Sequence, residues 1–364
     1  MKETVFEMTK RRTDALRSYM QEKKIDVSFI CSGPGVRYLS GFAGTPGDAS
    51  LLITPEKAFI FTDSRYTIQA GEQCPYYELR SAAAWDFSAV KECLPAGNPA
   101  VGFENREISY NSFTRMKNTF GFDNFVCLET AVADLRNIKD DWELDNIRIA
   151  CRIACDSIAE TVPYIKDGVR ELDLATELEY RMKKLGSPVP SFETIAVSGK
   201  ASSVPHGVPR PVKLERGFLT IDFGATAEGY HSDMTRTFCV GKADAEQKRL
   251  YETVLAAQTA AHGAIGPGVT GDEADAVARR IIDSAGYEGK FGHSLGHGVG
   301  LLIHELPNLS PKIVGRKLVP GNVVTNEPGI YIEGKYGCRI EDMVFITENG
   351  AENLTDFPHE LIEI

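Results

Sequence analysis

The stretch 221–238 carries two aspartates whose spacing suggests chemistry. It reads IDFGATAEGYHSDMTRTF, and its β-branched and aromatic arms around an Ala-Glu-Gly turn predict a β-hairpin. The midpoint between Asp222 and Asp233 falls inside that turn. Without a bulge the two carboxylates would therefore face each other, with Cβ atoms roughly 5 Å apart. On a solvated face the pair needs no partner, but if buried it predicts a cation between the two side chains.

A second pair of carboxylates has the same arrangement. In VVTNEPGIYIEGKYGCRIEDMVFI, residues 323–346, Glu327 and Glu341 are symmetric about Gly334. Two apolar arms flank that glycine, so a second hairpin with facing carboxylates is predicted. One such coincidence is weak, but two in one chain favour a shared site for all four side chains.

Between the hairpins lies the segment 291–307, FGHSLGHGVGLLIHELP. Its histidines His293 and His297 are four residues apart, which puts them on one face of a helix or a strand. Glycines at positions 292, 296, 298 and 300 argue against a helix and predict a backbone packed closely under a site. We therefore select His297 as a ligand candidate.

The surrounding pattern repeats once. Helices are predicted over 140–165 and 171–185, and again over 243–265 and 271–285, each pair followed by strands and a hairpin. At an offset of 100 residues, Ile165, Gly168, Val169 and Gly186 align with Ile265, Gly268, Val269 and Gly286. A single repeat of this length predicts two structural halves. If the halves pack about a pseudo-twofold axis, the four carboxylates converge.

Four carboxylates and one imidazole form a hard ligand set without the thiolates of a structural zinc site. Their charge exceeds what one divalent ion would balance, so we predict two divalent ions with a bridging water or hydroxide. Oxygen-rich ligands favour Mn(II), while Co(II), Fe(II) and Zn(II) stay open. Such a pair activates water and polarises a carbonyl, which is the chemistry of amide or ester hydrolysis.

Length and composition limit the class of protein. The chain has 364 residues, a net charge of −11 and eight cysteines without a CxxC pair. We predict two domains, an α/β domain over 1–137 and a second domain over 138–364. The acidic net charge and the lack of a basic patch argue against nucleic-acid binding. The sequence also contains no run of about 18 apolar residues, which is what a membrane-spanning helix would require. Without an export signal, reduced thiols and a cytoplasmic location are expected.

The contexts IDFGA, SDMTRTF, GHGVG, NEPGIY and RIED resemble the five-ligand set of the pita-bread metallopeptidases, in their Xaa-Pro peptidase branch of aminopeptidase P and prolidase. RYLSGFAGTPG and FTDSRYTIQA in the first third resemble the creatinase-type N-terminal domain. The resemblance implies an α+β protein: a creatinase-type α/β domain followed by a pita-bread domain, whose pseudo-twofold halves surround a curved antiparallel sheet. It also implies a homodimer.

By this resemblance Asp222 would bind one metal, Asp233 and Glu341 would bridge both, and His297 and Glu327 would bind the other. Glu327 would also accept the proton of the attacking water.

Four further residues would shape the substrate site. His206 in SVPHG would help form the pocket and move protons, and His293 and His304 would flank the proline site and the tetrahedral intermediate. Arg339, which shares strand parity with Glu341, would pair with a carboxylate of the site or of the substrate. The chain departs from the family at Leu302, expected to make the pocket less polar, and at Asn326, expected to point away from Glu327.

The expected activity is hydrolysis of Xaa-Pro bonds by hydroxide bridging two metals. Such bonds lack the amide N–H and are conformationally restricted. The N-terminal motifs favour an Xaa-Pro aminopeptidase acting on longer peptides over a prolidase restricted to dipeptides. A methionine aminopeptidase is disfavoured by the large N-terminal domain and Arg339. A catalytically silent binding protein is the remote alternative, because all five ligands are present.

Overall fold

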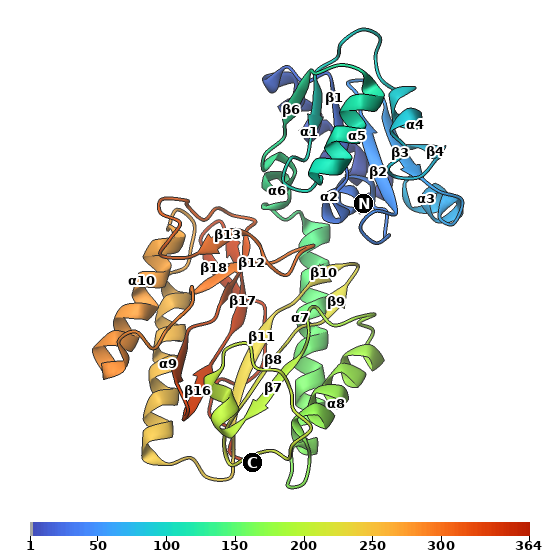
Figure 1. Ribbon diagram of the computed structural model, residues 1–364. Helices are drawn as coiled ribbons and strands as arrows, with labels where there is room; N and C mark the ends of the chain where they lie inside the picture. Colours follow the sequence, from blue (N-terminus) through green and yellow to red (C-terminus); the bar gives the residue numbers. More distant parts are fainter. Residues whose placement is uncertain (1–2) are drawn as a thin grey trace. The chain divides into compact units, whose positions relative to one another are not determined.

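The computed structural model describes residues 3–364, which divide into two compact units. The first unit ends at Arg136, and the second runs from Asn137 to Ile364. Both combine helices with sheets (Figure 1). Among the described residues, no helix is long and apolar enough to cross a membrane.

The first unit is an α/β layer structure, as predicted. Its six-stranded sheet has the order β4-β3-β2-β1-β5-β6 and mixes parallel and antiparallel pairs. Phenylalanines dominate its core, with Phe29 and Phe61 fully buried. The strands are β1 (Val27–Ile30), β2 (Ala49–Ile53), β3 (Ala58–Thr62), β4 (Glu78–Ser81), β5 (Val101–Phe103) and β6 (Phe125–Cys127). The helices are α1 (Val5–Lys23), α2 (Gly33–Ser40), α3 (Thr67–Gln73), α4 (Phe87–Lys91), α5 (Tyr110–Phe120) and α6 (Ala131–Arg136).

Two helix pairs build the second unit and follow the predicted repeat. Helix α7 begins with a capping box, in which the side chains of Asp140 and Glu143 accept hydrogen bonds from each other's backbone N–H groups. Gly168 and Gly268 have φ of 88° and 86°, so the loops after α7 and α9 turn in the same way. The helices are α7 (Asp141–Thr161), α8 (Glu171–Lys184), α9 (Ala245–Ala264) and α10 (Gly271–Ile282), with shorter turns η1 (Val162–Tyr164), η2 (Gly199–Ser203) and η3 (Asp283–Tyr287).

Antiparallel strands lie between the two helix pairs (Figure 1). One sheet has the order β11-β8-β7, the other β13-β12-β14-β17-β18, and two short ribbons pair β9 with β10 and β15 with β16. Each sheet packs on its own helix pair through a separate apolar core. This confirms the pita-bread architecture. The strands are β7 (Ile195–Ser198), β8 (Gly217–Phe223), β9 (Thr226–Ala227), β10 (Tyr230–His231), β11 (Met234–Val240), β12 (Gly296–Gly298), β13 (Glu305–Leu309), β14 (Val323–Asn326), β15 (Gly329–Ile332), β16 (Tyr336–Arg339), β17 (Asp342–Thr347) and β18 (Gly350–Asn353).

The strand pairing of the first hairpin differs from the predicted pairing by two residues. Its turn consists of Glu228 and Gly229 alone, with φ of 47° and 75°, the backbone of a type I′ turn. The chain therefore reverses one residue later than predicted, and Asp222 pairs with Thr235. Asp233 lies two residues before Thr235, on the same face. The two aspartates are diagonal neighbours, and the prediction that they are directly opposed was wrong.

The second hairpin keeps its predicted register. Asn326 pairs with Asp342, and Gly329 pairs with Arg339, so the centre is Gly334, whose φ is 71°. The positions of Glu327 and Glu341 lie opposite each other at the break between these two ladders.

The glycines of the segment 291–307 differ in whether the surrounding structure leaves space for a Cβ atom. A Cβ at Gly296 would lie 2.1 Å from the carbonyl oxygen of Thr325, and one at Gly298 would lie 2.2 Å from that of Leu306. These two positions confirm the predicted close packing of backbone. Gly292 has open space where a Cβ would lie, so it does not share that constraint.

Gly296→Ala is expected to destabilise the protein by about 1–3 kcal/mol, because the strand β14 must move to admit the methyl group. Gly292→Ala is the matched control and should change stability by less than about 0.5 kcal/mol. Urea unfolding of the two variants measures the difference. Equal stabilities would contradict the close-packing argument.

Candidate metal centre

All nine site residues that the sequence predicts line one cavity in the second unit. Its volume is about 660 Å³. The cavity brings together residues that span more than 100 positions of the chain. They lie on β8, β12 and β16 and at the breaks beside β11, β14 and β17. The nine are His206, Asp222, Asp233, His293, His297, His304, Glu327, Arg339 and Glu341.

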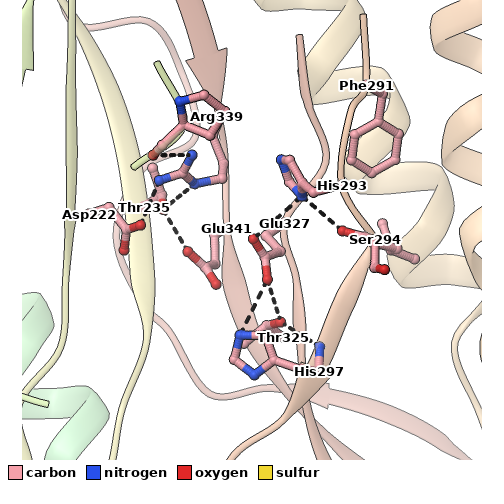
Figure 2. A network of polar contacts seen from close by, with 12 residues as sticks. Asp222, Thr235, Phe291, His293, Ser294, His297, Thr325, Glu327, Arg339 and Glu341 are labelled. Carbon is pink, nitrogen blue, oxygen red and sulfur yellow. Dashed lines mark hydrogen bonds and ion pairs between the residues drawn. The ribbon is translucent and has the colours of Figure 1, made fainter. Parts of the chain in front are cut away.

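Three of these side chains are close enough to hold one ion. Ligand atoms of Asp233, His297 and Glu341 all lie within 4.8 Å of one another. The His297 Nε2 atom is 3.5 Å from Asp233 Oδ2 and 3.4 Å from Glu327 Oε1. Figure 2 shows Glu327 between His293 and His297, with Glu341 alongside. Glu327 therefore extends the cluster to a fourth potential ligand.

Asp222 is held from the other side by a guanidinium. Arg339 Nη2 lies 2.5 Å from Asp222 Oδ2, and both residues are buried. The second carboxylate oxygen, Oδ1, is also buried but has no hydrogen-bond partner among residues 3–364. A buried carboxylate oxygen left without a partner is costly, and a cation would satisfy it.

Burial acts against the negative charges of this cluster. It raises the pKa of Glu327 to about 8, and burial together with neighbouring carboxylates raises the pKa values of Asp233 and Glu341 well above their usual range. Burial also lowers the pKa values of His293 and His297 to about 4. Both imidazoles are therefore neutral near pH 7. His297 Nδ1 faces the carbonyl oxygen of Gly298, which leaves the lone pair of His297 Nε2 available to a metal ion. An acidic cluster with neutral imidazoles fits divalent metal ions.

The remaining histidines border this cluster. The ring of His304 stacks obliquely on that of His297, with centroids 4.1 Å apart. His206 lies after η2 and lines the same cavity. Leu302, however, does not line the cavity, and 43% of its surface is exposed. The expectation that Leu302 makes the pocket less polar was wrong, because the turn at 300–304 directs Ile303 and His304 inward instead.

Sequence reasoning missed Tyr331. Its hydroxyl lies 3.0 Å from His293 Nε2 and accepts a hydrogen bond from Arg339 Nη1 at 2.6 Å. It thereby links a cavity imidazole to the guanidinium that holds Asp222. Strand parity with Glu327 could have indicated it, because residues two apart on a strand share a face.

Two family models match the chain. One, described as metallopeptidase family M24, matches residues 145–348. The chain belongs to metallopeptidase family M24. The other, described as the creatinase/prolidase N-terminal domain, matches residues 12–138. The second model covers most of the first compact unit, and the M24 model covers most of the second.

Relatives from the M24 family match over nearly the whole chain. The Xaa-Pro dipeptidase of Pyrococcus furiosus is 38% identical, covering 97% of this chain and 100% of the relative. A structure of an Xaa-Pro dipeptidase from Bacillus anthracis is 38% identical with a TM-score of 0.93, covering 98% and 100% of the two chains. A structure of an X-Pro aminopeptidase from Thermotoga maritima is 36% identical with a TM-score of 0.88, covering 97% and 99%.

The stability of the metal-free protein should fall as pH rises from about 5 to 8. Glu327 has a pKa of about 8 in the folded state against its usual 4.5, so the folded state binds more protons than the unfolded state in this window. The loss is about 1.4 kcal/mol per pH unit for each carboxyl that titrates there. Urea unfolding in the presence of a chelator measures the slope.

Glu327→Gln is the control for this slope, because the amide does not titrate. Its stability should depend less on pH than that of the wild type. A wild-type stability that is flat or rises between about pH 5 and 8 would contradict the account.

Proposed function

We propose that this protein is a metal-dependent peptidase that hydrolyses Xaa-Pro bonds and prefers dipeptides. The observation that carries the proposal is the convergence of Asp222, Asp233, His297, Glu327 and Glu341 on one cavity. Membership of the M24 family and relatives named Xaa-Pro dipeptidase support the substrate class.

The five converging residues would hold two divalent ions, with Mn(II) favoured by the oxygen-rich set. The carboxylates of Asp222, Asp233, Glu327 and Glu341 and the imidazole of His297 would supply the ligand atoms. When bound, the ions would lower the pKa of water and polarise the substrate carbonyl.

The protein's own groups would orient the substrate and move the proton. The Glu327 carboxylate would take a proton from the attacking water, because it is a basic group within the converging ligand set. Glu327 would then return this proton to the proline nitrogen that leaves. His293 is its neighbour in the cavity, with Nδ1 3.9 Å from Glu327 Oε2. Arg339 is oriented by Asp222 and Tyr331 and keeps a positive charge beside the carboxylates.

A lysine in the cavity wall supports the preference for dipeptides. Lys312 and Arg339 are the Lys and Arg side chains that line the cavity. Arg339 is engaged with Asp222, Tyr331 and Thr235, whereas the ammonium of Lys312 has no acidic partner among residues 3–364. A dipeptide product carries its carboxylate on the proline, and Lys312 would pair with that charge.

An Xaa-Pro aminopeptidase acting on longer peptides is the second candidate. The N-terminal motifs favoured it in the sequence, and the Thermotoga maritima relative is named X-Pro aminopeptidase. The relatives named dipeptidase or prolidase favour the dipeptide specificity instead. A homodimer and a cytoplasmic location stay predictions.

Asp233→Asn should abolish turnover, with at least about a 10³-fold loss of kcat/KM, and should lower metal content. The amide removes the charge of a side chain that lies among three other ligand candidates. Ala-Pro hydrolysis and metal analysis of the purified variant measure both effects. Full activity in this variant would refute the proposed site.

Chain-length preference is tested with Xaa-Pro dipeptides, Xaa-Pro-Yaa tripeptides and Xaa-Ala dipeptides in the presence of Mn(II). We expect cleavage of the Xaa-Pro dipeptides and little cleavage of the other two classes. Efficient cleavage of the tripeptides would favour the aminopeptidase instead.

Lys312→Ala should lower kcat/KM for Ala-Pro about tenfold, which is the value of one charge-assisted hydrogen bond. Ala-Pro amide lacks the carboxylate, so its hydrolysis should not change. Lys335→Ala, at an exposed lysine paired with Glu246, is the matched control. Equal losses for the acid and the amide would exclude this role for Lys312.

A further inference from the structure

Two threonine hydroxyls contact glutamates of the acidic cluster without lining the cavity themselves. Thr235 on β11 and Thr325 on β14 are fully buried, and neither lines the cavity. Each belongs to a different hairpin and touches a different glutamate, as Figure 2 shows. Both hydroxyls have the same pair of neighbours, one N–H group and one carboxylate oxygen.

The Thr235 hydroxyl joins Arg339 to Glu341. Arg339 Nε donates to Thr235 Oγ1 at 3.0 Å, and Thr235 Oγ1 lies 2.6 Å from Glu341 Oε2. A guanidinium can only donate hydrogen bonds. The hydroxyl must therefore accept from Arg339, which leaves its single proton for Glu341.

The Thr325 hydroxyl is placed in the same way in the other hairpin. The backbone N–H of His297 donates to Thr325 Oγ1 at 3.0 Å, and Thr325 Oγ1 lies 3.1 Å from Glu327 Oε1. A backbone N–H is also a donor only, so the hydroxyl proton points to Glu327. The close approach of Gly296 to Thr325 keeps the two strands together at this point.

We propose that Thr235 and Thr325 are positioning residues of the metal centre, each donating its hydroxyl proton to one glutamate and so fixing the rotation of that carboxylate. This inference rests on the proposed metal-dependent function. A metal-binding carboxylate is ionised and can only accept hydrogen bonds, so donation from the threonine suits the ligand state. One oxygen of each glutamate accepts a hydrogen bond from a threonine hydroxyl, and the other oxygen stays available to a metal ion.

The two threonines also connect the glutamates to the rest of the site. Through Thr235, the rotation of Glu341 is coupled to the guanidinium that holds Asp222. Through Thr325, the rotation of Glu327 is coupled to the backbone that carries the His297 ring. Hydrogen bonds of this kind around a metal centre typically contribute 10–100-fold to metal affinity or activity.

The test compares Thr→Val, which keeps the shape and removes the hydroxyl, with Thr→Ser, which keeps the hydroxyl. Mn(II) is titrated calorimetrically into metal-free T235V, T325V, T235S, T325S and wild-type protein. The matched control is T220V, because Thr220 is equally buried on β8 and its hydroxyl contacts Thr237 and no carboxylate. The thermal midpoint of each metal-free protein reports on folding.

We expect Mn(II) affinity to fall about 10–100-fold in each valine variant, to return within about threefold of wild type in each serine variant, and to stay unchanged in T220V. At saturating Mn(II), kcat should fall while KM changes less than about twofold, because neither threonine lines the cavity. Wild-type affinity in both valine variants would overturn the inference, as would serine variants as weak as valine. Wild-type protein that binds no Mn(II) would refute the proposed function as well.

Discussion

The second unit must accommodate the negative charge of several carboxylates that are largely buried around one cavity. Four carboxylates share one cavity wall, and the guanidinium of Arg339 is the fixed positive charge among them. Its shortest contact is to Asp222, so the remaining acids either retain protons or require cations. The raised pKa values of Asp233, Glu327 and Glu341 report that deficit. Concentrating these charges opposes folding, and the apolar cores of both halves must offset the cost.

The two-halved fold lets both hairpins supply ligands without leaving backbone groups unpaired. Glu327 and Glu341 lie where the ladder of β14 and β17 stops, and there the chain bonds to new neighbours. The N–H of Glu327 donates to Leu295 O at 2.8 Å, and that of Glu341 donates to Thr235 O at 3.1 Å. Glu341 thus joins the second hairpin to the first, and Glu327 joins it to the histidine segment. The same break in pairing places both glutamates at the cavity and connects the halves.

Local spacing was enough to predict the helices, the repeat and the convergence of four carboxylates with His297, because these follow from periodicity and symmetry. The other four cavity residues were indicated by the resemblance to a known family. The register of the first hairpin was not predictable, since it depends on Glu228 adopting a positive φ that is rare for this residue type. Tyr331 was missed because tyrosine is common in strands, and only its contacts distinguish it. Lys312, on which the proposed length preference rests, was also missed, because its place at the cavity comes from tertiary structure.

In the proposed function, this acidic cluster holds divalent cations. Calorimetric titration of the metal-free wild-type protein with Mn(II) near pH 8 tests it most directly, with proton release followed in two buffers of different ionisation enthalpy. The account predicts about two ions per chain and release of protons on binding, since the acids must give up their protons to become ligands. Absence of binding, or binding without proton release, would contradict it.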